Sequence, residues 1–187
     1  MTSSRKTELG KTAPGKMEPG KIDFRKILVP VDFSPPSFRA VRMAAELAHR
    51  FEGSVEIVHI FDPVAYPLPD GYYVMFTQPQ LEQMFAQFDL GLAACKREAL
   101  EAGAAQVDTH VRQGICAPEI CSIASDGHFD LIVMGTHGRR GLEHLLLGSV
   151  AERVLRQAPC PVLTVRADGP RSPAADGAGE AGMARSG

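Results

Sequence analysis

The sequence predicts an α/β fold in which helices cover both faces of one doubly wound, five-stranded parallel sheet. Short apolar runs alternate along the chain with longer amphipathic stretches, and glycine, proline or serine stands at most of the junctions between them. Strands that alternate with helices require a parallel sheet, because each crossover returns the chain to the same end of the sheet. Right-handed crossovers then leave only a few topologies.

The five predicted strands are short apolar or alternating segments. The first, KILVPVD, has the continuous apolar character of a strand that is buried on both faces. The third alternates between apolar and polar residues, as a half-buried strand does. The predicted strands cover residues 26–32, 54–61, 106–112, 130–135 and 161–166.

The first predicted helix begins after Ser34, which serves as its N-cap, with Pro35 in the first turn and Gly53 as the stop. The third predicted helix opens at Pro118 and ends at Gly127. The fourth covers residues 148–157.

The second predicted helix is the longest, starts near Leu81 and ends at Gly103. It carries apolar residues at helical spacing, and we assign this stripe to the core and give it no ligand role. The members of the stripe are Leu81, Met84, Phe85, Phe88, Leu92 and Ala99.

Residues 62–79 form an unusually long predicted loop between the second strand and the second helix. Its prolines and aromatic residues are consistent with a lid over a site, with a partner contact, or with a flexible insertion. All three interpretations remain open at this point.

We expect both ends of the chain to be disordered, which leaves residues 24–166 as a single domain. Residues 1–23 repeat Gly-Lys every five residues, and their five basic and three acidic side chains give a net charge of +2. Such a segment has too little apolar surface to fold on its own. Residues 167–187 are rich in alanine, glycine and proline and form the second predicted tail.

Composition excludes several classes of protein. The net charge of −2 and the pI near 6.3 argue against nucleic-acid binding, which normally requires a basic surface. No segment approaches the ~20 apolar residues of a membrane span, and there is no secretory leader pattern. We therefore expect no membrane contact and a cytoplasmic location.

The four cysteines contain no C-x-x-C pair, and we interpret them as small hydrophobic residues in a reducing compartment. A zinc site built from Cys116, Cys121 and a nearby histidine is the alternative, but the usual ligand spacing is absent.

The segment from Met134 to Val150, MGTHGRRGLEHLLLGSV, is the candidate chemical site. It leaves the end of one predicted strand and reaches the start of a predicted helix through a glycine-rich loop. Backbone amides in such a loop, together with the unpaired amides of a helix N-terminus, form an anion site. The alternative is that these glycines serve only tight turns and helix caps. Neither of the two common nucleotide signatures, G-x-x-x-x-G-K-[ST] and G-x-G-x-x-G, is present.

The same segment carries a pattern known from one protein family. Gly135-x2-Gly138-x9-Gly148-Ser149 resembles the G-2x-G-9x-G-[ST] signature of the ATP-binding branch of the universal stress protein family. KILVPVDFS, VHIFDP and APCPVLTVR resemble the family's first, second and last strands, so the resemblance covers about residues 25–166. It implies the strand order 3-2-1-4-5 and an adenine-nucleotide site where the first and fourth strands end.

The resemblance implies a role for each matching residue. Asp32 is expected to contact the ribose, or to lie near the phosphates and a metal ion, with a turn or capping carboxylate as the alternative. The implied ligand is ATP, with Mg²⁺ as an optional companion. The expected contacts are Pro30, Val31 and Ile60 around the base, Met134, Gly135, Gly138 and Arg139 in the loop, and Gly148, Ser149 and Val150 at the helix start.

Arg140 makes the loop doubly basic, and it either reaches a phosphate or points into solvent. His137 as a proton-transfer group is a minor alternative, and His144 has no fixed geometry relative to it. His59, which stands within an apolar strand, is expected to be a hydrogen-bonded core residue.

These observations lead to three hypotheses about function. The first is a regulator of the stress response that signals by nucleotide occupancy and by forming a homodimer through the last strand, residues 161–166. The second is a slow ATPase or phosphotransfer protein, although the sequence offers no evident base and nucleophile pair. The third is a dimeric interaction module without a ligand.

Overall fold

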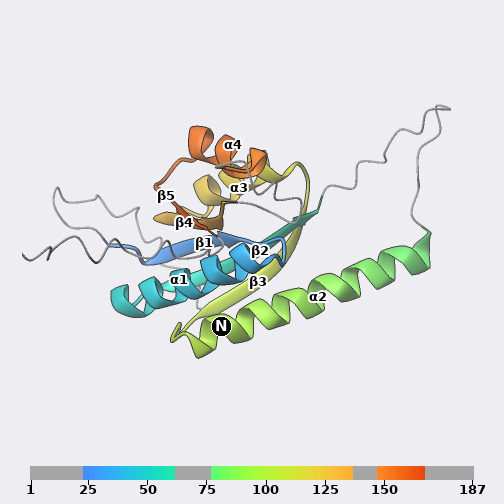
Figure 1. Cartoon of the computed structure of the whole chain (residues 1–187), viewed down its shortest axis with the longest axis horizontal. Helices are drawn as coiled ribbons and strands as arrows, with labels where there is room; N and C mark the ends of the chain where they lie inside the picture. Colours follow the sequence, from blue (N-terminus) through green and yellow to red (C-terminus); the bar gives the residue numbers. More distant parts are fainter. Residues whose placement is uncertain (1–22, 62–76, 137–146, 167–187) are drawn as a thin grey trace, which may run out of the picture.

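The computed structural model describes residues 23–61, 77–136 and 147–166 (Figure 1). One parallel sheet runs through it in the order β3-β2-β1-β4-β5, which confirms the predicted topology. The strands are β1 (Lys26–Pro30), β2 (Ser54–Phe61), β3 (Val107–Gln113), β4 (Leu131–Gly135) and β5 (Val162–Val165). The helices are α1 (Pro35–Phe51), α2 (Gln78–Glu101), α3 (Cys116–Asp126) and α4 (Ser149–Gln157).

Two hydrophobic cores lie on opposite faces of the sheet, as right-handed crossovers require. α1 and α2 cover one face, and α3 and α4 cover the other (Figure 1). Alternate residues of β1 serve the two cores: Ile27 and Val29 face α1, whereas Leu28 faces α3. All three are fully buried, so β1 is the central strand of the fold.

A carboxylate ties the starts of two strands together. Asp130 precedes β4, and its Oδ2 accepts hydrogen bonds from the backbone amides of Arg25 (3.0 Å) and Lys26 (2.8 Å). The Asp130 amide in turn donates to the Lys26 carbonyl at 2.9 Å. These bonds set the register of β4 against β1 at the amino ends of the strands.

Two helices begin earlier than predicted. α2 begins at Gln78, so the predicted loop was too long at its end. Thr77 is the N-cap, and its amide donates to the Gln80 side chain at 2.9 Å. α3 begins at Cys116, two residues before Pro118. A proline fits in a first turn, because amides there have no partner within the helix.

The apolar stripe of α2 is only partly core, which corrects the prediction. The buried residues of this helix are Leu92, Cys95 and Ala99, all in its second half. Phe85 in the first half is 41% exposed. The first turns of α2 extend past the sheet (Figure 1), where Phe85 contacts the end of β2 through Phe61.

Three predictions fall outside the described part of the chain: the N-terminal extension up to residue 22, the loop residues 62–76 and the C-terminal tail from residue 167. Within the described ranges, none of the helices combines the length and the hydropathy that a membrane span needs.

Candidate functional site

The pairing between β1 and β4 ends early, at the edge where open α/β sheets have their binding crevice. Their pairing covers only Ile27 with Leu131 and Leu28 with Ile132. The outer pairs run further, with β1 paired to β2 as far as Pro30 and β4 paired to β5 as far as Gly135. The chain turns in opposite directions from these two central strands. This is the switch point at which open α/β sheets bind their ligands.

Pro30 ends β1 at this edge of the sheet, and Val31 follows it directly. The backbone of Val31 is already committed, because its amide donates to the Val58 carbonyl at 2.8 Å and its carbonyl lies 2.8 Å from Nδ1 of His59. The Val31 side chain is 5% exposed. The Val31 amide is therefore not available to a ligand, whereas its carbonyl oxygen keeps a second lone pair.

Asp32 has a structural role through one of its carboxylate oxygens. Its Oδ1 accepts hydrogen bonds from the Ser34 amide (3.1 Å), the Ser34 hydroxyl (2.5 Å) and the Ser37 hydroxyl (2.5 Å). The Ser34 amide also donates to the Ser37 hydroxyl at 3.1 Å. The carboxylate thus organises the start of α1, which is the capping role that the sequence analysis kept as the alternative to ligand contact.

Ile60 and Met134 belong to the core on the α3 side of the sheet. They are 8% and 6% exposed and share one hydrophobic cluster, which also contains Leu28 and Val58. The structure therefore brings these two predicted residues onto the same face, whereas Val31 faces the opposite core.

A backbone hydrogen bond closes the glycine-rich loop at its base. The Gly148 amide donates to the Thr136 carbonyl at 2.7 Å, and the Thr136 amide donates to the Val165 carbonyl at 2.9 Å. Thr136 is only 3% exposed. Thr136 was not among the predicted site residues, although its place directly after the β4 glycine marks it as the point where the loop leaves the sheet.

The N-terminus of α4 supplies the other side of the site. Ser149 and Val150 are its first two residues, and no described residue accepts a hydrogen bond from either amide. Gly148, the N-cap, has φ −76°, a value that any residue adopts. Backbone conformation therefore does not require glycine at this position. The remaining physical reason for a glycine is that it leaves space for a neighbouring group.

The central part of the loop falls outside the described residues. It contains the predicted contacts Gly138 and Arg139, together with Arg140 and the two histidines His137 and His144. Their roles stay predictions.

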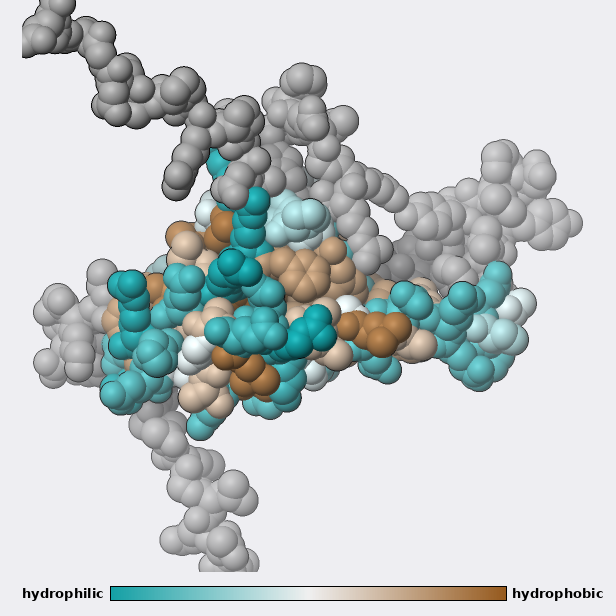
Figure 2. Space-filling view, turned by 60° about the horizontal axis from the view of Figure 1, so that its bottom comes forward, coloured by the Kyte–Doolittle hydropathy of each residue, from teal (hydrophilic) through white to brown (hydrophobic). Residues whose placement is uncertain are grey.

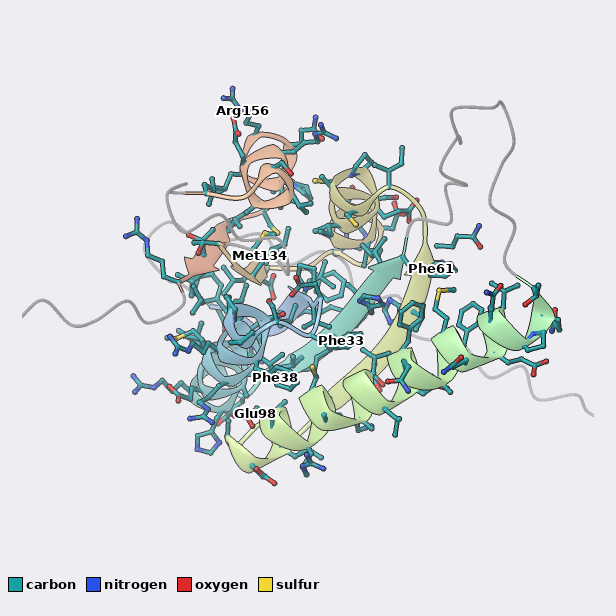
Figure 3. The ribbon with its side chains drawn as sticks, turned by 45° about the vertical axis from the view of Figure 1, so that its right-hand side comes forward. Phe33, Phe38, Phe61, Glu98, Met134 and Arg156 are labelled. Carbon is teal, nitrogen blue, oxygen red and sulfur yellow. The ribbon has the colours of Figure 1, made fainter. Side chains whose placement is uncertain are left out.

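An aromatic cluster beside the site was not predicted. The His59 ring lies 4.5 Å from the ring of Phe33 and 4.5 Å from that of Phe88, and Phe61 and Phe85 extend the cluster. Phe33 and Phe61 lie between β2 and α2 (Figure 3). His59 is 8% exposed, which confirms it as a hydrogen-bonded core residue.

Phe33 holds an unusual backbone conformation at the edge of the site. Its φ is +63°, in the left-handed region that a bulky residue rarely occupies. It directly follows Asp32, and its ring occupies the space above Gly91 of α2. The cluster therefore connects the end of β1 to α2. Only the tertiary structure brings these segments together, so no local sequence pattern predicted the contact between Phe33 and α2.

Burial raises the thiol pKa of three of the four cysteines. All four are free thiols. Burial raises the pKa of Cys95 to about 12, and the negative charges of Glu98 and Asp32 add to the effect. Burial also raises the pKa of Cys160 to about 11 and raises that of Cys121. Across residues 23–61, 77–136 and 147–166, no group of three or more His, Cys, Asp or Glu side chains is arranged to hold a metal ion.

Comparison with known proteins identifies the family. The sequence profile described as "Universal stress protein family" matches residues 23–166. The chain belongs to the universal stress protein family. Universal stress protein MJ0531 of Methanocaldococcus jannaschii is 37% identical over 145 residues, which are 76% of this chain and 82% of that protein. Putative universal stress protein SERP1273 of Staphylococcus epidermidis is 33% identical over 148 residues, 78% of this chain and 86% of that protein.

Solved structures agree with this assignment. Universal stress protein UspA from Lactobacillus plantarum is 25% identical with a TM-score of 0.67, over 78% of this chain and all of that one. A universal stress protein solved in complex with cAMP has a TM-score of 0.59 at 24% identity, over 77% of this chain and 98% of that one. One from Archaeoglobus fulgidus solved with dAMP has a TM-score of 0.55 at 21% identity, over 78% and 99%. The last two likenesses show the shared Rossmann-like fold.

Proposed function

We propose that this universal stress protein is a regulator that binds an adenine nucleotide, ATP in particular, in the crevice between β1 and β4. The observations that carry the proposal are the early end of the β1–β4 pairing and the first-turn amides of α4, which donate to none of the described residues. The crevice offers space at the switch point, and the helix N-terminus offers donors and a positive dipole end to phosphate. The complete G-2x-G-9x-G-[ST] signature joins these two features.

In this proposal, the start of α4 provides both space for the phosphates and hydrogen-bond donors to them. The Gly148 amide is already bonded to Thr136, so Gly148 contributes space for the phosphates. The amides of Ser149 and Val150 are the donors, together with the Ser149 hydroxyl. Gly138 and Arg139 are proposed to close around the phosphates from the loop.

Asp32, Pro30 and Ile60 are proposed to border the ribose and the base, with Met134 and Gly135 on the β4 side of the crevice. The carboxylate keeps its capping bonds through Oδ1 while the residue faces the crevice. If Mg²⁺ accompanies the nucleotide, the phosphates together with water would supply most of its ligands. That arrangement is usual for Mg²⁺ and needs no cage of protein side chains.

Two fold neighbours support the class of ligand. Both were solved with adenine nucleotides, cAMP in one and dAMP in the other. ATP, rather than a monophosphate, is the finer proposal and rests on the length of the glycine-rich loop and its two arginines.

We propose that nucleotide occupancy signals through a homodimer formed along β5. The proposed location of the protein is the cytoplasm. β5 is an edge strand, and the carbonyls of Pro161 and Val165 accept hydrogen bonds from the amides of Ile132 in β4 and of Thr136 directly after it. Backbone groups alternate along a strand, so those of Val162 and Thr164 point to the open edge. Replacing Thr164 by proline removes an outward amide and no bond to β4. We expect this variant to stay folded and to lose the β5 dimer in light scattering.

Calorimetric titration of Mg·ATP, AMP and cAMP tests the ligand. Gly148→Glu places a side chain and a negative charge where the phosphates are proposed to lie, and the backbone at φ −76° accepts it. Ala105→Glu adds the same group at an exposed position before β3 and is the matched control. We expect ATP to bind the parent and the control and not Gly148→Glu. Binding that is equal in all three chains would contradict the phosphate site.

The Asp32→Asn variant distinguishes between contact of Asp32 with the nucleotide and its capping of α1. The amide oxygen keeps an acceptor for the two serines, so the melting temperature should change little, while loss of the charge should weaken ATP binding about tenfold. An unchanged affinity would assign Asp32 to the capping role alone.

The other two hypotheses are outcomes of the same series. Steady ATP hydrolysis that Asp32→Asn abolishes would make the protein a slow ATPase. Absence of any heat, together with an unshifted melting temperature in ~100-fold excess ATP, would leave a dimeric interaction module.

A further inference from the structure

The solvent-facing side of α2 carries a regular pattern that the folded domain does not use. Exposed residues recur there at alternating spacings of three and four, which is the heptad spacing of a helix that pairs with another helix. The pattern occupies the side of α2 opposite its buried residues Leu92, Cys95 and Ala99. Its members, called the outer stripe below, are Gln83, Ala86, Leu90, Ala93, Arg97 and Leu100.

The outer stripe contains two of the most exposed large apolar side chains in the described residues. Leu90 is 65% exposed and Leu100 is 48% exposed. Apolar surface interrupts the hydrophilic surface on this side of the molecule (Figure 2). Ala86 and Ala93 lie between the leucines and would let another backbone approach closely.

We propose that the outer stripe pairs with the same stripe of a second copy of this chain, in antiparallel orientation. In an antiparallel pair, each first heptad position faces a fourth position of the partner helix. Leu90 then lies against Ala93 of the other copy, and Arg97 lies against Ala86, so that large side chains meet small ones. Gln83 lies against Leu100 at the ends of the contact. A parallel pair would instead place Arg97 against Arg97.

Charges beside the outer stripe complement each other in the same arrangement. Asp89 and Lys96 flank the stripe on one side, seven residues apart. The antiparallel register places Asp89 of one copy opposite Lys96 of the other, twice by symmetry. Neither side chain forms an ion pair with any described residue. On their own helix, the positions three and four residues away from each are apolar.

The size of the contact indicates a weak dimer. The stripe runs over about 26 Å of helix axis at 1.5 Å per residue. A strip of that length and ~10 Å wide on each copy buries on the order of 500 Å² in total, below the ~1,200–2,000 Å² of stable specific interfaces. Association should therefore depend on protein concentration. The contact uses no residue of the crevice or of β5, so it is independent of the proposed nucleotide site and of the β5 dimer.

Sedimentation velocity of the full chain over a range of concentrations tests the proposal. All variants carry Thr164→Pro, so that pairing through β5 does not contribute. We expect self-association in this background. Asp89→Lys should weaken it roughly tenfold, because two attractive pairs become repulsive. Lys96→Asp should weaken it similarly, and the double variant Asp89→Lys with Lys96→Asp should restore it.

Two further variants complete the experiment. Asp108→Lys makes the same charge change at an exposed site on β3 and should leave association unchanged. Leu90→Lys should abolish association without lowering the melting temperature, since Leu90 is largely in water. A chain that stays monomeric at every concentration would overturn the proposal. So would association that is insensitive to Asp89→Lys, or a double variant that fails to recover.

Discussion

α1 and α2 cover the same face of the sheet, yet they contribute to its core in different ways. α1 has 17 residues, and its buried positions run along its whole length. α2 has 24 residues and buries three of them. The buried residues of α1 are Pro36, Ser37, Ala40, Val41, Ala44, Ala45 and Ala48.

The difference has a physical cause in side-chain size and in position. Alanines at 40, 44 and 48 form a small-residue face that lets α1 lie close to the central strands. α2 lies beside the edge strand β3 and extends past it (Figure 1). A helix in that position keeps half of its surface for other contacts. Two helices that cover the same face of a sheet can therefore differ in how much of their surface they bury.

The largest expected effect is on the free energy of unfolding when an alanine is replaced by leucine in α1 rather than in α2. Ala44→Leu adds volume at a position of α1 with no exposed surface and should lower the free energy of unfolding by about 2–3 kcal/mol. Ala93→Leu in α2 should change it by less than about 0.5 kcal/mol. Urea denaturation of dilute protein measures both. Equal losses would show that α2 is covered as completely as α1.

Titration of Cys95, the buried thiol of α2, should make stability depend on pH. Its pKa is about 12 in the folded chain, against an ordinary value of 9.0. Above pH 9 the unfolded chain loses this proton while the folded chain keeps it, so stability is full below pH 9 and falls as the pH rises toward 12. Between pH 9 and about pH 10.5, the free energy of unfolding should fall about 1–2 kcal/mol more in the parent than in Cys95→Ala. Parallel pH profiles would place the thiol in contact with water.

Gly91 marks the point where α2 changes from surface to core. A Cβ at this position would lie 2.6 Å from the Phe33 ring. Alanine normally stabilises a helix interior by ~1 kcal/mol relative to glycine. Here we expect Gly91→Ala to reverse that gain and to destabilise the protein by about 1 kcal/mol, because Phe33 has to move. A rise in melting temperature would show that the Phe33 ring yields easily.

The smallest effect concerns the first turn of α2. Gln80→Ala removes the acceptor of the Thr77 amide and hydroxyl bonds, at 2.9 Å and 3.0 Å. The cost to global stability should be about 0.5 kcal/mol, because this turn packs against little. Hydrogen exchange of the Leu81 amide, which donates to the Thr77 carbonyl at 3.0 Å, should accelerate more than that of the Leu92 amide. A loss as large as that of Ala44→Leu would contradict the division of α2 into a surface half and a core half.

The order of the elements was predictable because each has a local cause. The apolar run of β1, the serine and proline before α1 and the glycine after it act on neighbouring residues. Helix starts were predicted less well, since Thr77 with Gln80 and a proline inside the first turn of α3 are subtler signals. The family's glycine signature also led from the sequence to Gly148 and Ser149 at the start of α4.

The contacts that complete the candidate site were not predictable in this way. The bond between Gly148 and Thr136 spans the glycine-rich loop, and the stack of His59 with Phe33 and Phe88 joins three separate elements. The three hydrogen bonds that one Asp32 oxygen accepts likewise depend on how the chain turns after β1. None of these contacts has a signature in the spacing of residues.

The sequence by itself therefore determined the fold class, the strand order through the family resemblance, and the segment that carries the candidate chemistry. Periodicity and end signals act within a few residues of one another, so they can be read along the chain. Only the tertiary structure decided how far α2 is covered, where the β1–β4 pairing ends and which backbone groups the described residues bond to one another. Those properties depend on the distance between segments in space, which the order of residues does not contain.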